Sequence, residues 1–264
     1  MFKRGIIISV LASLLLLAGC GKFQKLLKSN NNQLKYETAI ALFDKGSYSK
    51  AMQLFEQITP EYKGTDKAEK IAYMNAYCYY HEKDFILANH YFKQFAEEFP
   101  TSQYAEECAY NAAYCKYLDS PIPSLDQTNT YDAVKELQIF INKYPQSKRV
   151  DQSNNLIDEL REKLELKSFN IGKLFFKTND IQAAIVCFNN MLKEFPDTKY
   201  REEVLYMLMK TYQRFAEKSI DSKMPERYGQ VFETCDKILS DFPKTKYLKE
   251  VTSVQKEAEK YIKK

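Results

Sequence analysis

Four segments of the chain place apolar residues three and four positions apart, which is the spacing of one helix face. Each segment starts from a small residue and reaches a proline twelve positions later. The starting residues and prolines are Ala88 and Pro100, Ala133 and Pro145, Ala184 and Pro196, and Val231 and Pro243. A degenerate copy begins at Ala51 and carries Lys63 where the proline would stand. The pattern therefore predicts five related helices.

A hydroxyl residue follows each proline by two positions: Ser102, Ser147, Thr198 and Thr245. Proline cannot continue a helix, and a serine or threonine hydroxyl can cap the N-terminus of the next one. Each of these positions is therefore predicted to be a junction at which one helix ends and another begins.

The spacing Ala-x3-Phe-x7-Pro is the second-helix half of the tetratricopeptide (TPR) pattern. The first half is clearest at Gly172 and Phe175, which precede Ala184 by twelve and nine positions. A generic helical bundle would show this register only by coincidence. We therefore expect an all-α fold, a right-handed superhelix of about five tetratricopeptide-like helical hairpins with a C-terminal capping helix.

The repeats are longer than the usual period of about 34 residues, so extra residues must lie in loops or in longer helices. Residues 119–130 contain two prolines and are predicted to be a loop, as are residues 218–229. We expect a long helix over about 151–166, between the third and fourth repeats. The charged segment 247–264 is expected to be the capping helix.

The N-terminus has the character of a secretion signal. Lys3 and Arg4 precede an almost wholly apolar run from Ile6 to Leu17, which has the length of a signal-peptide core. Leu17 to Cys20, Leu-Ala-Gly-Cys, resembles the bacterial lipobox, although an ordinary signal peptide or a buried helix could also contain these residues. We expect residues 1–19 to be cleaved and Cys20 to carry a diacylglycerol and an N-acyl chain.

The residues that follow Cys20 indicate the membrane to which the mature lipoprotein is sorted. No aspartate follows Cys20, so the usual inner-membrane retention signal is missing and the outer membrane is expected. Residues 20–33 include the polar run Ser-Asn-Asn-Asn-Gln and are predicted to be a lipidated tether. Two acyl signals are enough for stable anchoring without a membrane-spanning helix.

The amino-acid composition argues against several further classes of function. Without residues 1–19, 37 of the 39 basic residues face 35 acidic ones, which argues against a nucleic-acid-binding protein. The chain has only 7 glycines, few for phosphate-binding loops, and no tryptophan for stacking sugars. The odd number of cysteines after Cys20 and the absence of C-x-x-C favour unpaired thiols in the helical core over disulfides.

No catalytic or metal-binding motif is present. His81 and His90 lie nine positions apart without the spacing of a zinc site, so both are expected on helix surfaces, and we predict no cofactor. TPR hairpins instead present grooves that bind extended peptides. The candidate groove residues are tyrosines of the early helices: Tyr73, Tyr77, Tyr80, Tyr110, Tyr114 and Tyr117.

With its lipobox, five repeats and junctions such as "EEFPTSQYAEECAYNAAYC", "AVKELQIFINKYPQSKRV" and "KEFPDTKYREEVLYML", the chain resembles the BamD family of outer-membrane protein assembly lipoproteins. The resemblance covers nearly the whole chain, and the departures are the long loops and Lys63. It implies a non-enzymatic protein on the periplasmic face of the outer membrane. Residues 34–118 would bind unfolded outer-membrane protein precursors, and residues 119–264 would bind the periplasmic domains of a BamA-like barrel insertase.

Two other functions remain open at this level. One is a periplasmic TPR adaptor lipoprotein that coordinates cell-envelope machinery, although such adaptors often carry a coiled coil that is missing here. The other is a surface lipoprotein of the SusD type that captures glycans, although its longer chain and stacking aromatics are also missing. Depletion of the protein would separate the three functions. A broad loss of outer-membrane barrels would favour barrel assembly, a division defect would favour the adaptor, and a single nutrient defect would favour the glycan binder.

Overall fold

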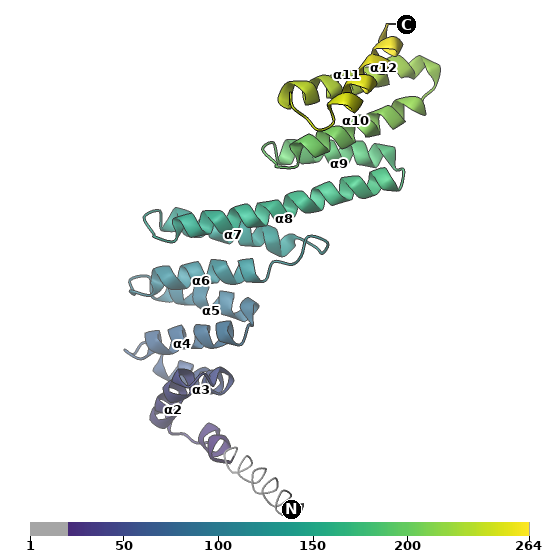
Figure 1. The fold of residues 1–264 in the computed structure, drawn as a ribbon. Helices are drawn as coiled ribbons and strands as arrows, with labels where there is room; N and C mark the ends of the chain where they lie inside the picture. The colour runs from purple at the N-terminus through teal and green to yellow at the C-terminus, as the bar shows by residue number, and fades with distance from the viewer. Residues whose placement is uncertain (1–20, 264) are drawn as a thin grey trace, which may run out of the picture. The chain divides into compact units, whose positions relative to one another are not determined.

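The computed structural model describes residues 21–263, and its regular structure is entirely helical within that range (Figure 1). The elements are α2 (Asn32–Asp44), α3 (Tyr48–Tyr62), α4 (Ala68–His81), α5 (Phe85–Glu98), α6 (Ala105–Leu118), α7 (Thr128–Lys143), α8 (Val150–Lys177), α9 (Ile181–Glu194), α10 (Arg201–Glu217), the 3-10 turn η1 (Asp221–Lys223), α11 (Met224–Asp241) and α12 (Leu248–Ile262). From α2 onward, five consecutive helix pairs are followed by one last helix. The all-α prediction with five hairpins and a capping helix is confirmed.

The chain divides into two compact units. The N-terminal unit comprises the residues up to Ser120 together with Asn129–Leu156, and the C-terminal unit comprises Pro121–Thr128 together with the residues from Ile157 onward. The long helix α8 contributes residues to both, and it extends well beyond the predicted 151–166 because it continues directly into the first helix of the fourth repeat.

Tight turns close three of the hairpins. The residue two positions before the second helix adopts a left-handed backbone at Gly46, Lys83 and Asn179, with φ of 73°, 63° and 65°. This conformation ends the first helix in the manner of a Schellman motif. Asp84 and Asp180 then accept hydrogen bonds from backbone N–H groups of α5 and α9. Each turn therefore needs only three residues.

The small residues of the repeat pattern lie where helices approach most closely. Ala51, Ala88, Ala133, Ala184 and Val231 are all completely buried. A Cβ atom added at Gly172 would lie 2.5 Å from Cε1 of Phe188, so only glycine fits there without a shift of the ring. The five small residues that define the predicted register are therefore buried, as expected.

Each predicted junction hydroxyl makes two hydrogen bonds. Ser102, Ser147, Thr198 and Thr245 each accept from the backbone N–H two positions later, at 3.0 to 3.2 Å. That N–H belongs to the residue just before the helix, not to the first helical turn as the capping prediction implied.

Each hydroxyl also donates to a glutamate in the first helix of the preceding hairpin. We call the arrangement the junction clasp. Its pairs are Ser102 with Glu69 (2.6 Å), Ser147 with Glu106 (2.6 Å), Thr198 with Glu165 (2.8 Å) and Thr245 with Glu202 (2.6 Å). The clasp joins the first helices of neighbouring repeats in the same way at every proline-bearing junction.

Of the predicted irregular segments, residues 119–127 form a loop as expected, whereas segment 218–229 and the tether are more ordered than expected. Met224–Gly229 of the predicted loop 218–229 are the first turns of α11. Proline in the first turn of a helix is compatible with helix formation because the N–H there needs no partner, and Pro225 occupies such a position. The predicted tether also differs, since residues 21–27 are helical and Phe23, Leu26 and Leu27 pack against the first hairpin.

The cysteines of the described chain are unpaired. Cys78, Cys108, Cys115 and Cys235 are buried, and burial raises the pKa of Cys78, Cys115 and Cys235 to about 12. Cys187 is only partly buried. The prediction of unpaired core thiols therefore holds for four of these residues.

Candidate polypeptide-binding face

Tyrosine side chains of α4, of α6 and of the residue just before α6 lie against one another in the N-terminal unit. The ring centroids of Tyr73 and Tyr104 are 4.5 Å apart, and those of Tyr73 and Tyr77 are 4.8 Å apart. Tyr114 stacks on Tyr117 with an interplanar angle of 12°. We call the partly exposed set the tyrosine row, and its members are Tyr73, Tyr77, Tyr80, Tyr104, Tyr114 and Tyr117.

A carboxylate of α6 lies at the centre of the row. Glu107 accepts a short hydrogen bond from the Tyr77 hydroxyl and a longer one, at 3.5 Å, from the Tyr73 hydroxyl. Asn111 Nδ2 donates to the Tyr77 oxygen at 2.7 Å. Burial, together with the bond to Glu107, raises the pKa of Tyr77, so its phenol keeps its proton. The network fixes both the rings and the carboxylate.

One predicted groove residue lies beneath the surface. Tyr110 is 2% exposed, and its ring packs between Phe140, at 5.4 Å, and Tyr114, at 5.8 Å. The Arg149 guanidinium lies 4.4 Å from the centroid of the same ring. Tyr110 points from α6 toward α7, which buries it, so it supports the row and adds no surface to it. The other five predicted tyrosines belong to the row.

Sequence reasoning missed Glu107 and Asn111. Each lies 34 residues after the tyrosine that it contacts, Tyr73 and Tyr77 respectively. That distance equals the usual length of one repeat, so equivalent positions of adjacent first helices face one another. A comparison of residues one period apart could have found the network.

A cavity of about 230 Å³ lies on another face of α4, between α3 and α5. Its lining includes Glu56, Asn75, Tyr91 and Phe95. Tyr79 stacks on Tyr91 at 4.7 Å and donates a hydrogen bond to Glu56. The Oδ1 atom of Asn75 is buried there without a hydrogen-bond partner. The cavity is separate from the tyrosine row because its α4 residues project in a different direction around the helix.

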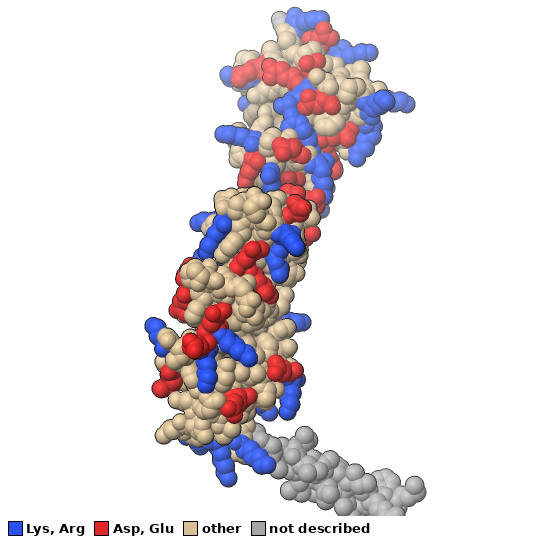
Figure 2. Space-filling model, turned by 90° about the vertical axis from the view of Figure 1, so that its left-hand side faces the viewer, with Lys and Arg blue, Asp and Glu red and all other residues tan. Residues whose placement is uncertain are grey.

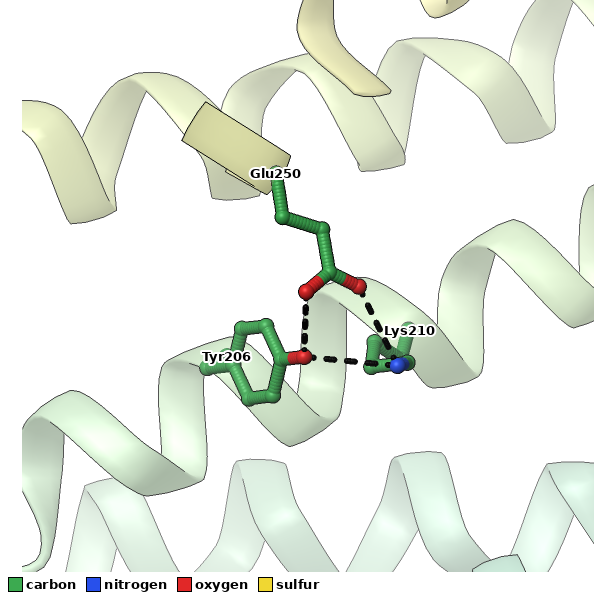
Figure 3. A network of polar contacts seen from close by, with 3 residues as sticks. All are labelled: Tyr206, Lys210 and Glu250. Atoms are coloured by element: carbon green, nitrogen blue, oxygen red, sulfur yellow. Dashed lines mark hydrogen bonds and ion pairs between the residues drawn. The ribbon is translucent and has the colours of Figure 1, made fainter. Parts of the chain in front are cut away.

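The C-terminal unit carries a polar network between α10 and α12 (Figure 3). Glu250 accepts from the Tyr206 hydroxyl at 2.7 Å and from Lys210 Nζ at 3.1 Å, and Lys210 also donates to the Tyr206 oxygen at 3.3 Å. The hydrogen bond from Tyr206 lowers the pKa of Glu250. Tyr206 also stacks on Tyr247 at 3.7 Å. The network fastens the capping helix at its N-terminal end.

The remaining candidate chemistry is sparse. Both histidines are exposed on their helices, and His81 stacks on Tyr48 at 4.2 Å. Between residues 21 and 263, no three His, Cys, Asp or Glu side chains come together as a metal site. In the same range no helix combines the length and the apolar character needed to cross a bilayer. The lipobox and Cys20 lie outside the described residues.

Comparison with known proteins gives one family. Residues 28–225 match the model of the YfiO family, whose members are described as outer membrane lipoproteins. The outer membrane protein assembly factor BamD of Rickettsia prowazekii (strain Madrid E) is 25% identical over 177 residues, which are 67% of this chain and 70% of that protein.

Among solved structures, TPR-like repeats attributed to a kinesin light chain of Podosopora anserina align over 79% of this chain and 98% of that one, with 12% identity and a TM-score of 0.35. A variant of the same repeats gives a TM-score of 0.32 over 81% of this chain and 96% of that one, with 11% identity. Scores this low add nothing to the hairpins described above. The family match spans most of the chain, and the chain belongs to the YfiO family of outer membrane lipoproteins, the family of BamD.

Proposed function

We propose that this chain is a lipid-anchored, non-enzymatic component of the machinery that assembles β-barrel proteins in the outer membrane. Acyl chains on Cys20 hold it to the periplasmic face. The N-terminal unit binds unfolded barrel precursors, and the C-terminal unit binds the periplasmic domains of a BamA-like insertase. Recognition needs no cofactor, since the work consists of holding one polypeptide beside another.

The tyrosine row carries this proposal. Tyrosine combines a large apolar ring with a hydroxyl, which suits the binding of an extended chain that has both apolar side chains and backbone polar groups. Glu107 Oε1 already accepts the two phenols, whereas no side chain of residues 21–263 donates to Oε2. That oxygen is available to an N–H group of a bound precursor. The fixed rings reduce the entropy that binding must overcome.

A photo-crosslinking experiment in cells tests the row. A benzoylphenylalanine residue replaces Tyr80 or Tyr114, and a newly made, labelled barrel precursor is the target. Tyr131 on α7 is the matched control, because it is a tyrosine that is 52% exposed and lies outside the row. We expect precursor adducts at Tyr80 and Tyr114 and none at Tyr131.

Two further readouts separate the parts of the proposal. Mild-detergent purification through a C-terminal tag should recover a barrel protein with tandem periplasmic domains, and Cys20→Ala should abolish incorporation of labelled palmitate. Recovery of the insertase without adducts at the row would move the precursor site elsewhere. The assembly function would be refuted if neither the insertase nor precursor adducts were found and if depletion of the protein left outer-membrane barrels at normal levels. That result would favour the envelope adaptor.

A further inference from the structure

The described chain begins with a concentration of positive charge. Residues 21–36 contain four lysines and no acidic residue. Lys35 is buried and donates to Gln57 at 2.8 Å. The other three, Lys22, Lys25 and Lys28, are exposed, and we call them the anchor-proximal lysines. No ion pair in residues 21–263 involves any of the three, so their charge is uncompensated by direct contact.

Packing fixes this charge on the first hairpin. Phe23, Leu26 and Leu27 lie on one side of the helical segment 21–27 and contact the buried cluster formed by α2, α3 and α4. The lysines occupy the other side. Lys50 of α3 joins them, because its Nζ lies 5.7 Å from the centroid of the Phe23 ring. In Figure 2, basic side chains gather at the N-terminal end of the described chain.

We propose that the anchor-proximal lysines, together with Lys50, form a surface that binds the anionic phospholipid headgroups of the leaflet that holds Cys20. The inference rests on the lipid anchor of the proposed function. A residue spans at most about 3.6 Å, so Lys22 lies within about 7 Å of the acylated cysteine along the chain. From Lys22 to Lys28 the helical rise adds only about 9 Å.

Charge at this distance from the anchor meets the leaflet whatever partner the protein binds. Basic segments next to a membrane anchor are attracted to anionic lipids, and the attraction acts within about one Debye length, about 8 Å at physiological salt. Because Phe23 and its neighbours hold the segment against the first hairpin, the attraction also seats that hairpin at the membrane surface. The occupant is thus an anionic lipid surface.

Amine labelling of the intact lipoprotein tests the surface. The full chain is expressed with its own signal, its acylation is verified by mass, and it is reconstituted into vesicles of phosphatidylcholine alone or with phosphatidylglycerol. The rate of lysine acetylation is then read by peptide mass spectrometry. We expect the anchor-proximal lysines and Lys50 to react about threefold more slowly in the anionic vesicles, and the difference to disappear in about 0.5 M NaCl.

Two triple variants sharpen the test. In K22Q/K25Q/K28Q, Lys50 should react at the same rate in both vesicle types. In K237Q/K249Q/K256Q, which removes three exposed lysines of α11 and α12, the protection should remain. Equal labelling of the unmodified chain in both vesicle types, with the protein anchored, would overturn the headgroup surface alone. If the full chain, expressed with its own signal, carries no acyl groups by mass and does not float with vesicles, both the headgroup surface and the lipid anchor are overturned.

Discussion

Different side-chain interactions dominate the two units. Within the described residues, nearly all close ring pairs lie in the N-terminal unit, from Tyr36 with Tyr62 to Phe140 with Tyr144. That unit has a single ion pair there, Lys93 with Glu136 at 3.1 Å. The C-terminal unit has few ring pairs and the remaining ion pairs, among them Arg201 with Asp241.

The two kinds of contact differ in their response to salt and in what they leave exposed. Aromatic contacts are little affected by salt and leave ring faces and hydroxyls for a second polypeptide. Exposed ion pairs contribute about 0 to 1 kcal/mol each and are screened by salt. Under the proposed function, the aromatic contacts of the N-terminal unit would serve to hold the unfolded precursor, and the charged side chains of the C-terminal unit would meet the folded periplasmic domains of the insertase.

The largest expected effect is the same in both units. Phe92 and Phe188 occupy the same repeat position and are both completely buried. Phe92→Ala and Phe188→Ala should each lower the free energy of unfolding of their unit by about 3 to 5 kcal/mol. Urea denaturation followed by hydrogen exchange measures both. Costs that differ by several kcal/mol would show that the units differ in their cores as well as in their surfaces.

A smaller effect should distinguish two junction clasps. Glu165 is 8% exposed, so Thr198→Val leaves a buried carboxylate without its donor and should cost about 2 to 3 kcal/mol. Glu106 is exposed, so Ser147→Ala should cost about 1 kcal/mol or less. Thermal unfolding checks both, and Thr198→Ser, which keeps the hydroxyl, is the control. Equal costs would mean that burial of the glutamate is irrelevant.

Salt should separate the networks of the two units. Tyr77→Phe removes a donor to Glu107 and should cost about 1 kcal/mol, with little change in about 0.5 M NaCl. Lys210→Met removes a cation from Glu250 and should cost less than about 1 kcal/mol, and that cost should vanish at the same high salt. Denaturation at two salt concentrations gives the comparison. If the cost of Tyr77→Phe depended on salt, the proposed difference between the two networks would be contradicted.

The smallest effects concern acid. Partial desolvation of the exposed His81 ring, which stacks on Tyr48, lowers its pKa below 6.5, so its contribution to stability is present above pH 6.5 and is lost as pH falls through the lowered value. The hydrogen bond from Tyr206 lowers the pKa of Glu250 below 4.5, so its contribution is present above pH 4.5 and is lost at lower pH. His81→Gln should flatten the first step and Glu250→Gln the second, in melting temperatures measured from about pH 3 to 8. A single step unaffected by either variant would refute this assignment.

The sequence predicted what local patterns control. Helix identity, the buried alanines and the proline junctions follow from spacing within one hairpin, so they could be predicted from residues close together in the chain. The glutamates of the junction clasp could not, because each lies 33 to 43 residues from its hydroxyl. The burial of Tyr110 likewise depends on α7. The loop of residues 119–127 places α7 against α6, and the course of that loop does not follow from a local sequence pattern.

Two errors have the same physical origin. The segment 218–229 carries a proline and a glycine, which favour a loop locally, yet α11 begins at Met224 because Tyr228 is buried in the core of the C-terminal unit. The polar run at residues 29–33 led to the prediction of a tether over residues 20–33, yet Phe23, Leu26 and Leu27 find apolar partners in the first hairpin. In both segments tertiary packing outweighed local propensity.

The junction clasp gives neighbouring repeats a common seam. Every proline-bearing seam presents the same donor and the same acceptor, a hydroxyl on one side and a carboxylate on the other. A chain from which one whole repeat had been excised, between Ser102 and Ser147 for example, would bring Glu69 to a serine again. Gene duplication or deletion could thus lengthen or shorten such a protein without inventing a new seam, and an engineer could splice it in the same way.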